Sequence, residues 1–190
     1  MQDLEPYYGW RDIYISEEDP KSPFFNKVYN ELHYTNKLYN YLIHPQWDVI
    51  GSPTLFIKLL YINYEKQIAI IELFGEWNDA IHNDIMILKR NILDVLINEN
   101  INKFVLIGEN ILNFHRGDLD YYEELKADIS ESDGWVFGLN FEPHVLLEMQ
   151  RGKMNNFIIF NEEVHLNWRA QSPFTFHKWI NQFIQKNMLS

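Results

Sequence analysis

Ten side chains that could bind a partner, a ligand or a metal ion gather in three short segments. Two segments directly follow apolar runs, at residues 76–82 and 115–118, and the third is a proline-marked turn at residues 44–48. The ten candidates are His44, Trp47, Glu76, Trp77, Asn78, Asp79, His82, His115, Arg116 and Asp118. Because ligands gather at the carboxyl ends of strands in open α/β sheets, the first two segments predict a binding edge.

A metal site would need more ligands than any one of these segments supplies. Asp79 and His82 are three residues apart and share one face of a predicted helix. Two ligands do not define a site, and a third would have to come from elsewhere, for example His115 or His165. The sequence has no HxxxH and no HxH spacing. We therefore expect neither a metal ion nor another cofactor, and we interpret Asp79 as a helix-capping carboxylate.

Motifs of nucleophilic or phosphate chemistry are absent from the sequence. There is no GxxxxGK[ST], no GxGxxG and no GxSxG, and Gly108-Glu109 does not form a phosphate-binding loop. The chain has no cysteine, so disulfides, thiolate metal sites and cysteine nucleophiles are excluded. These observations favour a binding protein over an enzyme.

Charge and hydropathy narrow the classes of partner. The 190 residues carry a net charge of −11, with 27 acidic residues against 16 basic ones. A chain this acidic repels phosphate backbones and anionic lipids, and its one compact basic cluster, Lys89-Arg90, is interpreted as part of a solvated helix face. No apolar run approaches the roughly 20 residues that cross a bilayer. We expect a cytoplasmic protein that binds neither nucleic acid nor membranes.

The chain divides near residue 52. Residues 1–52 mix turn formers with aromatic side chains, and nine of the eleven tyrosines precede residue 65. Because disordered segments are poor in aromatics, we expect this extension to pack on the core, or else to pair with another chain. Residues 53–190 form the predicted α/β domain.

Residues 53–190 alternate between strand and helix patterns. The expected strands are 54–64, 67–77, 102–114, 134–141 and 155–160, and the expected helices are 78–100, 118–132, 142–152 and a last one from Ser172-Pro173. In the first helix the apolar stripe is Ile81, Ile85, Leu88, Ile92 and Val95. Gly152 is expected to take the left-handed conformation that ends a helix. A hairpin followed by strand–helix–strand units predicts a mixed sheet.

This order resembles the STAS domain of anti-sigma-factor antagonists over residues 54–188. IAIIELFGEWND is similar to the first core strand and its turn, INKFVLIGENILNFH to the second strand, and GWVFGLNFEPHVLLEMQRGKMNNFIIF to the end of that domain. The resemblance implies an α/β fold, a mixed β-sheet with helices packed on it, and a regulatory role in protein binding. The whole chain also resembles a group of soluble bacterial proteins without an assigned activity.

The turn that carries the phosphorylated serine or threonine in STAS domains differs here. The corresponding stretch is Phe114-His115-Arg116-Gly117-Asp118, and the nearest serines, Ser130 and Ser132, are a full helix away. The resemblance therefore implies the scaffold without its phosphoswitch.

Two functional hypotheses remain. The first is a non-enzymatic interaction module that binds a protein, such as an anti-sigma-like regulator, through residues 78–82 and 115–120. The alternative is a small enzyme or ligand-binding protein with a pocket between the N-terminal segment and the sheet edge. That pocket would be lined by His44, Trp47, Glu76, His82 and His115. A homodimer formed by the N-terminal aromatics is compatible with either hypothesis, and deleting residues 1–50 would then leave a folded monomer.

Overall fold

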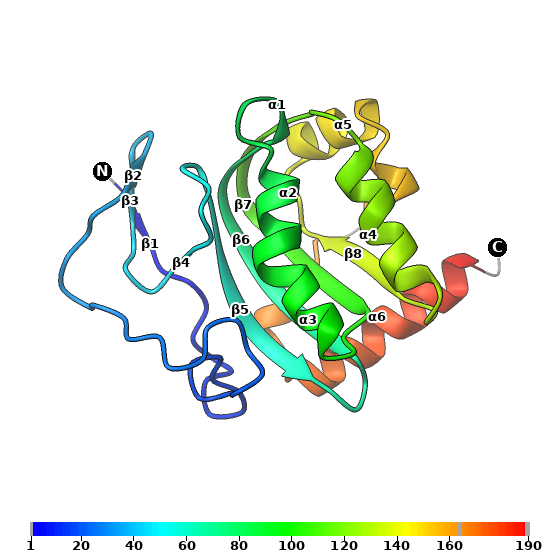
Figure 1. The fold of residues 1–190 in the computed structure, drawn as a ribbon, viewed down its shortest axis with the longest axis horizontal. Coiled ribbons are helices and arrows are strands. Elements are labelled where there is room, and N and C mark those ends of the chain that lie inside the picture. Colours follow the sequence, from blue (N-terminus) through cyan, green and yellow to red (C-terminus); the bar gives the residue numbers. More distant parts are fainter. Residues whose placement is uncertain (1, 163–164, 189–190) are drawn as a thin grey trace.

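A mixed sheet of six strands runs through the part of the chain that the computed structural model describes, residues 2–162 and 165–188 (Figure 1). In spatial order the strands are β4 (Asp48–Val49), β5 (Leu55–Asn63), β6 (Ile68–Asn78), β7 (Lys103–His115), β8 (Trp135–Leu139) and β9 (Ile159–Phe160). β4, β5 and β6 pair antiparallel, whereas β6 to β9 pair in parallel. The expected α/β fold class, a mixed sheet with helices packed on it, is thereby confirmed.

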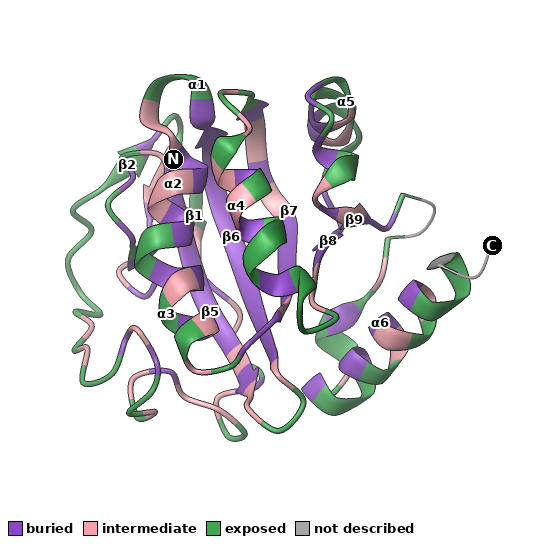
Figure 2. Ribbon diagram, turned by 45° about the vertical axis from the view of Figure 1, so that its right-hand side comes forward, coloured by how far each residue is buried: buried purple, intermediate pink, exposed green. Residues whose placement is uncertain are grey.

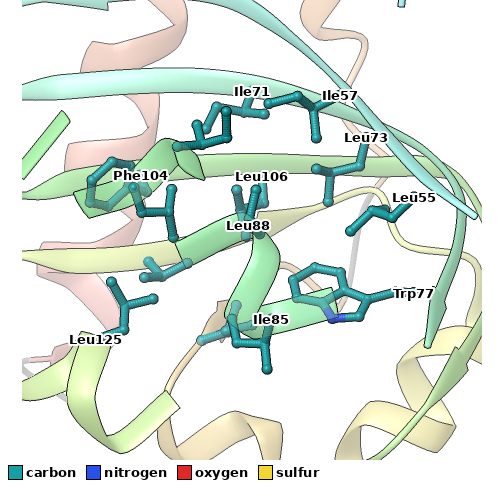
Figure 3. Close-up of a cluster of buried hydrophobic side chains, with 14 of the residues drawn as sticks. Leu55, Ile57, Ile71, Leu73, Trp77, Ile85, Leu88, Phe104, Leu106 and Leu125 are labelled. Carbon is teal, nitrogen blue, oxygen red and sulfur yellow. The ribbon is translucent and has the colours of Figure 1, made fainter. Parts of the chain in front are cut away.

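The central strands are apolar because both faces of the sheet are covered. Every residue of β6 is buried (Figure 2). One face packs against the helices α2 (Asp84–Leu88), α3 (Asp94–Asn98) and α4 (Asp120–Ser130). Figure 3 shows Leu88 and Leu125 from these helices over Phe104 and Leu106 of β7. The other face packs against α6 (Pro173–Met188), with Trp10 and Trp168 filling the space between them.

The first helix is broken, contrary to the prediction of one helix over residues 78–100. It consists of α1 (Asp79–His82), α2 (Asp84–Leu88), a π-helical turn η1 (Lys89–Leu93) and α3 (Asp94–Asn98). The break lies at Asn83, whose φ of 52° is left-handed. As a result Ile85, Leu88 and Ile92 are buried as expected, while Ile81 is 75% exposed and Val95 36% exposed.

The remaining helices follow the predicted order, with changes at their ends. α4 spans Asp120–Ser130 and α5 spans Pro143–Arg151, and proline begins both α5 and α6 as the sequence predicts. The left-handed cap expected at Gly152 is instead formed by Lys153, with φ of 64°, while Gly152 stays right-handed at −73°. Single 3₁₀ turns, η2 (Met154–Asn156) and η3 (Trp168–Ala170), precede β9 and α6.

The N-terminal segment runs along the β5 side of the sheet, where it is drawn in blue in Figure 1. Three short strands of this segment, β1 (Gln2–Leu4), β2 (Lys37–Leu38) and β3 (Tyr41–Ile43), pair with one another. Leu38, Ile43 and Trp47 pack on Phe56 and Phe74 of the main sheet, forming a third apolar cluster. None of the described helices is long and apolar enough to span a bilayer.

Lys89 is buried, although the sequence predicts that it belongs to a solvated helix face. Its side chain is 1% exposed, and its ammonium group contacts the carboxylates of Asp94 (2.6 Å), Glu124 (3.2 Å) and Asp128 (2.7 Å). The two acidic groups on α4 cannot be recognised as partners from sequence, because they lie more than thirty residues away.

Candidate functional site

The two predicted binding segments meet at one edge of the sheet. β6 and β7 run in parallel, and their last residues are paired, Trp77 with Phe114 and Asn78 with His115. Residues 76–82 and 115–118 therefore lie side by side at the carboxyl ends of these strands, at the top of the view in Figure 1. We call these two segments together the rim.

Asp79 connects the rim to the interior of the protein through hydrogen bonds. Its buried carboxylate accepts hydrogen bonds from the Tyr122 hydroxyl (2.6 Å), the Trp77 indole N–H (3.0 Å) and the backbone N–H of Ile85 (2.8 Å). Burial raises the pKa of Asp79 to about 6, although these hydrogen bonds favour the charged form. The contacts tie α1 to α2 and α4, so Asp79 serves as a structural acceptor in this arrangement.

Asn78 and Gly117 also hold α1 in position. The Asn78 side chain caps α1 by accepting a hydrogen bond from the backbone N–H of Ile81 at 3.0 Å. Gly117 passes so close to α1 that a β-carbon there would lie 2.6 Å from the carbonyl oxygen of Asp79. Only a residue without a side chain allows the loop after β7 to pack in this way.

Glu76 links the rim to the N-terminal segment. Its carboxylate accepts hydrogen bonds from the Tyr39 hydroxyl and from the Asn78 side-chain amide (2.8 Å), and Nε2 of His115 lies 3.8 Å away. Burial by itself would raise the pKa of Glu76, but the hydrogen bonds from Tyr39 and Asn78 outweigh it and lower that pKa. Glu76 is therefore held as an anion.

Trp77 is not part of any exposed recognition surface. Its side chain is completely buried on the face of the sheet that α2, α3 and α4 cover, among Leu55, Ile85 and Leu88 (Figure 3). The alternating directions of side chains along β6 place Trp77 inside the protein.

The exposed part of the rim combines one apolar side chain with charged groups. Ile81 is 75% exposed, and the side chains of His115, Arg116 and Asp118 are also exposed. Asp118 does not cap α4, because Leu119 occupies that position and no side chain caps it; Asp120 lies in the first turn, where an acidic group is favourable. Ile81 was assigned to the core by helical periodicity, so its exposure could not be recognised from sequence.

No cation site forms at the rim. Asp79 directs its oxygens to Tyr122, Trp77 and Ile85, and His82 is not among its hydrogen-bond partners. Across residues 2–162 and 165–188, no group of three or more histidines and carboxylates is arranged to hold a metal ion.

His44 and Trp47 lie away from the rim, in the N-terminal segment. Trp47 stacks on Phe74, with ring centroids 5.3 Å apart, and its indole donates to the carbonyl of Leu4 at 2.7 Å. His44 is buried, and its Nε2 lies 3.5 Å from Glu5. The five residues proposed to line a common pocket, His44, Trp47, Glu76, His82 and His115, are therefore spread over two regions.

A row of largely buried charged residues crosses four neighbouring strands of the sheet and was missed in the sequence. It consists of Asp48, Lys58, Glu72 and Glu109, on β4, β5, β6 and β7. Lys58 lies 3.9 Å from Asp48 and is paired in register with Glu72. Arg169 bridges the two glutamates and lies 3.1 Å from Glu72. The available signal was a single charged residue inside each apolar run, in LFIKLL, IAIIELF and FVLIGEN.

The N-terminal segment supplies partners for this row. Lys27 contacts Asp48 at 2.7 Å, and the backbone N–H of Tyr7 donates to Glu72 at 2.8 Å. Burial lowers the pKa of Lys58 and raises the pKa of Asp48, while their mutual attraction opposes both shifts. The segment therefore neutralises charges that the sheet could not bury alone.

Comparison with known proteins shows similarity in solved structures alone. The anti-sigma factor antagonist SpoIIAA in its unphosphorylated form is 15% identical with a TM-score of 0.45, and the match covers 56% of this chain and 89% of that one. An anti-sigma factor antagonist from Thermotoga maritima is also 15% identical with a TM-score of 0.41, covering 57% and 86%. No protein-family model and no curated protein matches the sequence. Each of these two matches covers a little over half of this chain.

Proposed function

We propose that this protein is a non-enzymatic interaction or regulatory module that binds a protein partner through the rim. The observation that carries the proposal is Ile81, a large apolar side chain of α1 that is 75% exposed. The hydrogen bonds of Asp79 and Asn78 and the close approach of Gly117 hold α1 in place. An apolar side chain presented by an ordered element suits a contact that fills a partner's pocket.

The polar groups of the rim support binding rather than turnover. The oxygens of Asp79 and Glu76 accept hydrogen bonds from within the protein, so neither carboxylate is free to accept a proton from a substrate. Around Ile81, the exposed side chains of His115 and Arg116 suit an acidic partner surface. With no serine or threonine between residues 115 and 129, binding would not be controlled by phosphorylation of a hydroxyl at this turn.

Site-specific crosslinking tests this proposal. A photo-reactive amino acid replaces Ile81 in one variant and Leu147 in a control, because Leu147 is an apolar residue of α5 that is also exposed, at 46%. In cells that express the protein, we expect position 81 to give a discrete adduct and position 147 to give none. The Arg116→Glu change should reduce the adduct at position 81 at least about fivefold, by reversing one interfacial charge.

The crosslinked product also identifies the kind of partner. An adduct of a second protein supports the proposal, and an anti-sigma-like regulator is one candidate. An adduct of twice the chain mass would instead show a homodimer contact at the rim. Equal adducts at positions 81 and 147, or none at either, would rule out a specific rim interface.

A further inference from the structure

Tyr39 lies in the turn between β2 and β3, beside the rim but outside the two segments that define it. Its hydroxyl donates a hydrogen bond to the carboxylate of Glu76, and Nε2 of His115 lies 3.8 Å from the same carboxylate. Tyr39 is nevertheless 63% exposed. The surface of the rim therefore continues from His115, past Glu76, into the N-terminal segment.

Consecutive hydrogen bonds join Tyr39 to Ile81. Glu76 also accepts a hydrogen bond from the side-chain amide of Asn78 at 2.8 Å, and the Asn78 oxygen accepts one from the backbone N–H of Ile81 at 3.0 Å. Two large exposed side chains, one from the N-terminal segment and one from α1, are thus connected through the same rim residues. Side chains that are ordered before a partner binds lose less conformational entropy on binding.

The turn holds Tyr39 in a backbone conformation that a bulky residue rarely adopts. Its φ of 52° is left-handed. The preceding residue, Leu38, is buried against Phe74, and Gly75 leaves room for it, since a β-carbon at Gly75 would lie 3.0 Å from Cδ2 of Leu38. Strained conformations of this kind persist where surrounding contacts enforce them, and they occur often at binding sites. Tertiary contacts therefore set the position of Tyr39.

The aromatic ring of Tyr39 is available for contact with another molecule. It belongs to none of the three apolar clusters, and it forms no ring or cation contact within residues 2–162 and 165–188. Tyr34, another exposed tyrosine of the N-terminal segment, differs because its ring meets the ring of His44 edge-on, with centroids 5.7 Å apart. Tyrosine is enriched among the residues that contribute most to protein interfaces.

Two exposed cations adjoin this surface in the sequence. Lys37 lies in β2, two residues before Tyr39, and Arg116 follows His115 in the rim. The side chain of neither cation forms an ion pair or hydrogen bond with the described part of the chain. The chain has 27 acidic residues against 16 basic ones, so two cations left without a carboxylate favour an acidic group on a partner.

We propose that Tyr39 is a second contact residue of the rim interface, and that the partner presents an acidic protein segment to it. An apolar side chain of that segment packs on the ring of Tyr39, while its carboxylates pair with Lys37 and Arg116. This role of Tyr39 rests on the proposed function of the rim, and it adds the N-terminal segment to the interface.

Crosslinking from position 39 in the full chain tests this role. A photo-reactive phenylalanine derivative replaces Tyr39 in one variant and Tyr34 in a control, and both are compared with the same derivative at position 81. In cells that express the protein, we expect positions 39 and 81 to give adducts with the same protein, and position 34 to give none. Mass spectrometry of the peptide joined to position 39 should show more aspartate and glutamate than lysine and arginine.

Substitutions measure the contribution of the ring. Tyr39→Asn removes the ring but keeps a residue that tolerates left-handed φ, so circular dichroism should show an unchanged fold. It should reduce the adduct from position 81 about tenfold, as expected when an interface anchor is truncated. Tyr39→Phe keeps the ring and should reduce that adduct only about threefold, because the ring is no longer held by Glu76. Tyr34→Asn should change it less than about twofold.

A charge reversal tests the acidic character of the partner. Lys37→Glu should reduce the adduct from position 81 about fivefold, because it repels the carboxylates of the partner. Lys186→Glu, at an exposed position of α6, makes the same change of charge and should alter the adduct less than about twofold. Equal losses from the two reversals would overturn the pairing of Lys37 with the partner.

The possible results distinguish the role of Tyr39 from the function of the rim. An adduct at position 81 with none at position 39 would overturn the role of Tyr39 and leave the rim interface standing. An adduct at position 39 with none at position 81 would instead overturn the contact through Ile81, and no adduct at either would overturn both. Equal adducts at positions 34 and 39, a joined peptide without an excess of acidic residues, or an adduct of twice the chain mass would also overturn the role proposed for Tyr39.

Discussion

Glu72 lies in the middle of β6 with its carboxylate completely enclosed. It accepts hydrogen bonds from the backbone of Tyr7 and from Arg169, and Glu109 competes for the same guanidinium group. Burial raises the pKa of Glu72 to about 7, with the negative charge of Glu109 acting in the same direction and the contacts from Tyr7 and Arg169 opposing it. This glutamate therefore changes its charge near neutral pH.

Stability should depend on pH through this residue. In the unfolded chain the Glu72 proton is lost near pH 4.5, whereas the folded chain keeps it to about pH 7. The free energy of unfolding should therefore fall as pH rises from 4.5 to 7, by at most about 3 kcal/mol, and stay constant above that range. Glu72→Gln should remove this contribution, so the wild type should lose stability relative to the variant across the window.

Urea denaturation at several pH values measures the difference between the two proteins. Glu123→Gln, at an exposed position of α4, provides the control that should follow the wild type at every pH. A difference between wild type and Glu72→Gln that does not vary with pH would show that Glu72 is ionised throughout.

At the scale of elements, the loop that follows β7 must pack closely against α1 for the rim to form. Gly117→Ala would place a carbon 2.6 Å from the carbonyl oxygen of Asp79, and backbone must move to relieve the contact. We expect a loss of about 1–3 kcal/mol in the free energy of unfolding, as for other overpacked sites. Crosslinking from position 81 should decrease as well, because α1 is displaced.

Gly152→Ala is the matched control for this change. A β-carbon at Gly152 would have its nearest neighbour at 3.3 Å, and φ there is an ordinary −73°. The cost should stay below about 1 kcal/mol. Equal losses from the two substitutions would mean that the contact between Gly117 and α1 does not hold the rim.

The π-helical turn η1 and α4 are joined through Lys89. Lys89→Met keeps the length of the side chain but leaves three carboxylates, Asp94, Glu124 and Asp128, without their shared cation. We expect thermal and urea unfolding to show a loss of about 3 kcal/mol, as when one partner of a buried ion pair is removed. Arg90→Met affects two of the same carboxylates from a side chain that is 47% exposed, and should cost less than about 1 kcal/mol. Similar costs for both would contradict a special role of Lys89.

At the scale of the whole molecule, the N-terminal segment and the sheet form one charge-balanced structure. Deleting residues 1–50 would remove Asp48 and Lys27 together with Trp10, and would expose Lys58, Glu72 and an apolar face of the sheet. These contacts argue against a folded monomer after deletion, and we expect an aggregated or unfolded chain by circular dichroism and light scattering. The double change Val28→Ser with Leu32→Ser affects residues that are 91% and 82% exposed and should leave the fold intact. A folded, monomeric deletion variant would show that the segment is a separate appendage.

The candidate site was only partly predictable. The meeting of residues 76–82 with 115–118 followed from parallel strands, whose carboxyl ends lie at one edge. Grouping His44 and Trp47 with them stays a prediction. The structure places both residues in the N-terminal segment, and nothing in the local sequence indicates on which side of the sheet that turn packs. The exposure of Ile81 was also unpredictable, since one left-handed residue, Asn83, interrupts an otherwise regular helical periodicity.

The sequence by itself determined the order of the elements, most of the buried apolar positions and the proline-led starts of α5 and α6. These features depend on side chains within a few residues of one another, and apolar periodicity records such local relations directly. Tertiary structure alone decided how the charges are paired: Lys58 with Glu17 and Asp48, Glu72 with Arg169, and Lys89 with α4. These partners are separated by ten to nearly a hundred residues, and burial has to bring them together before their attraction becomes significant.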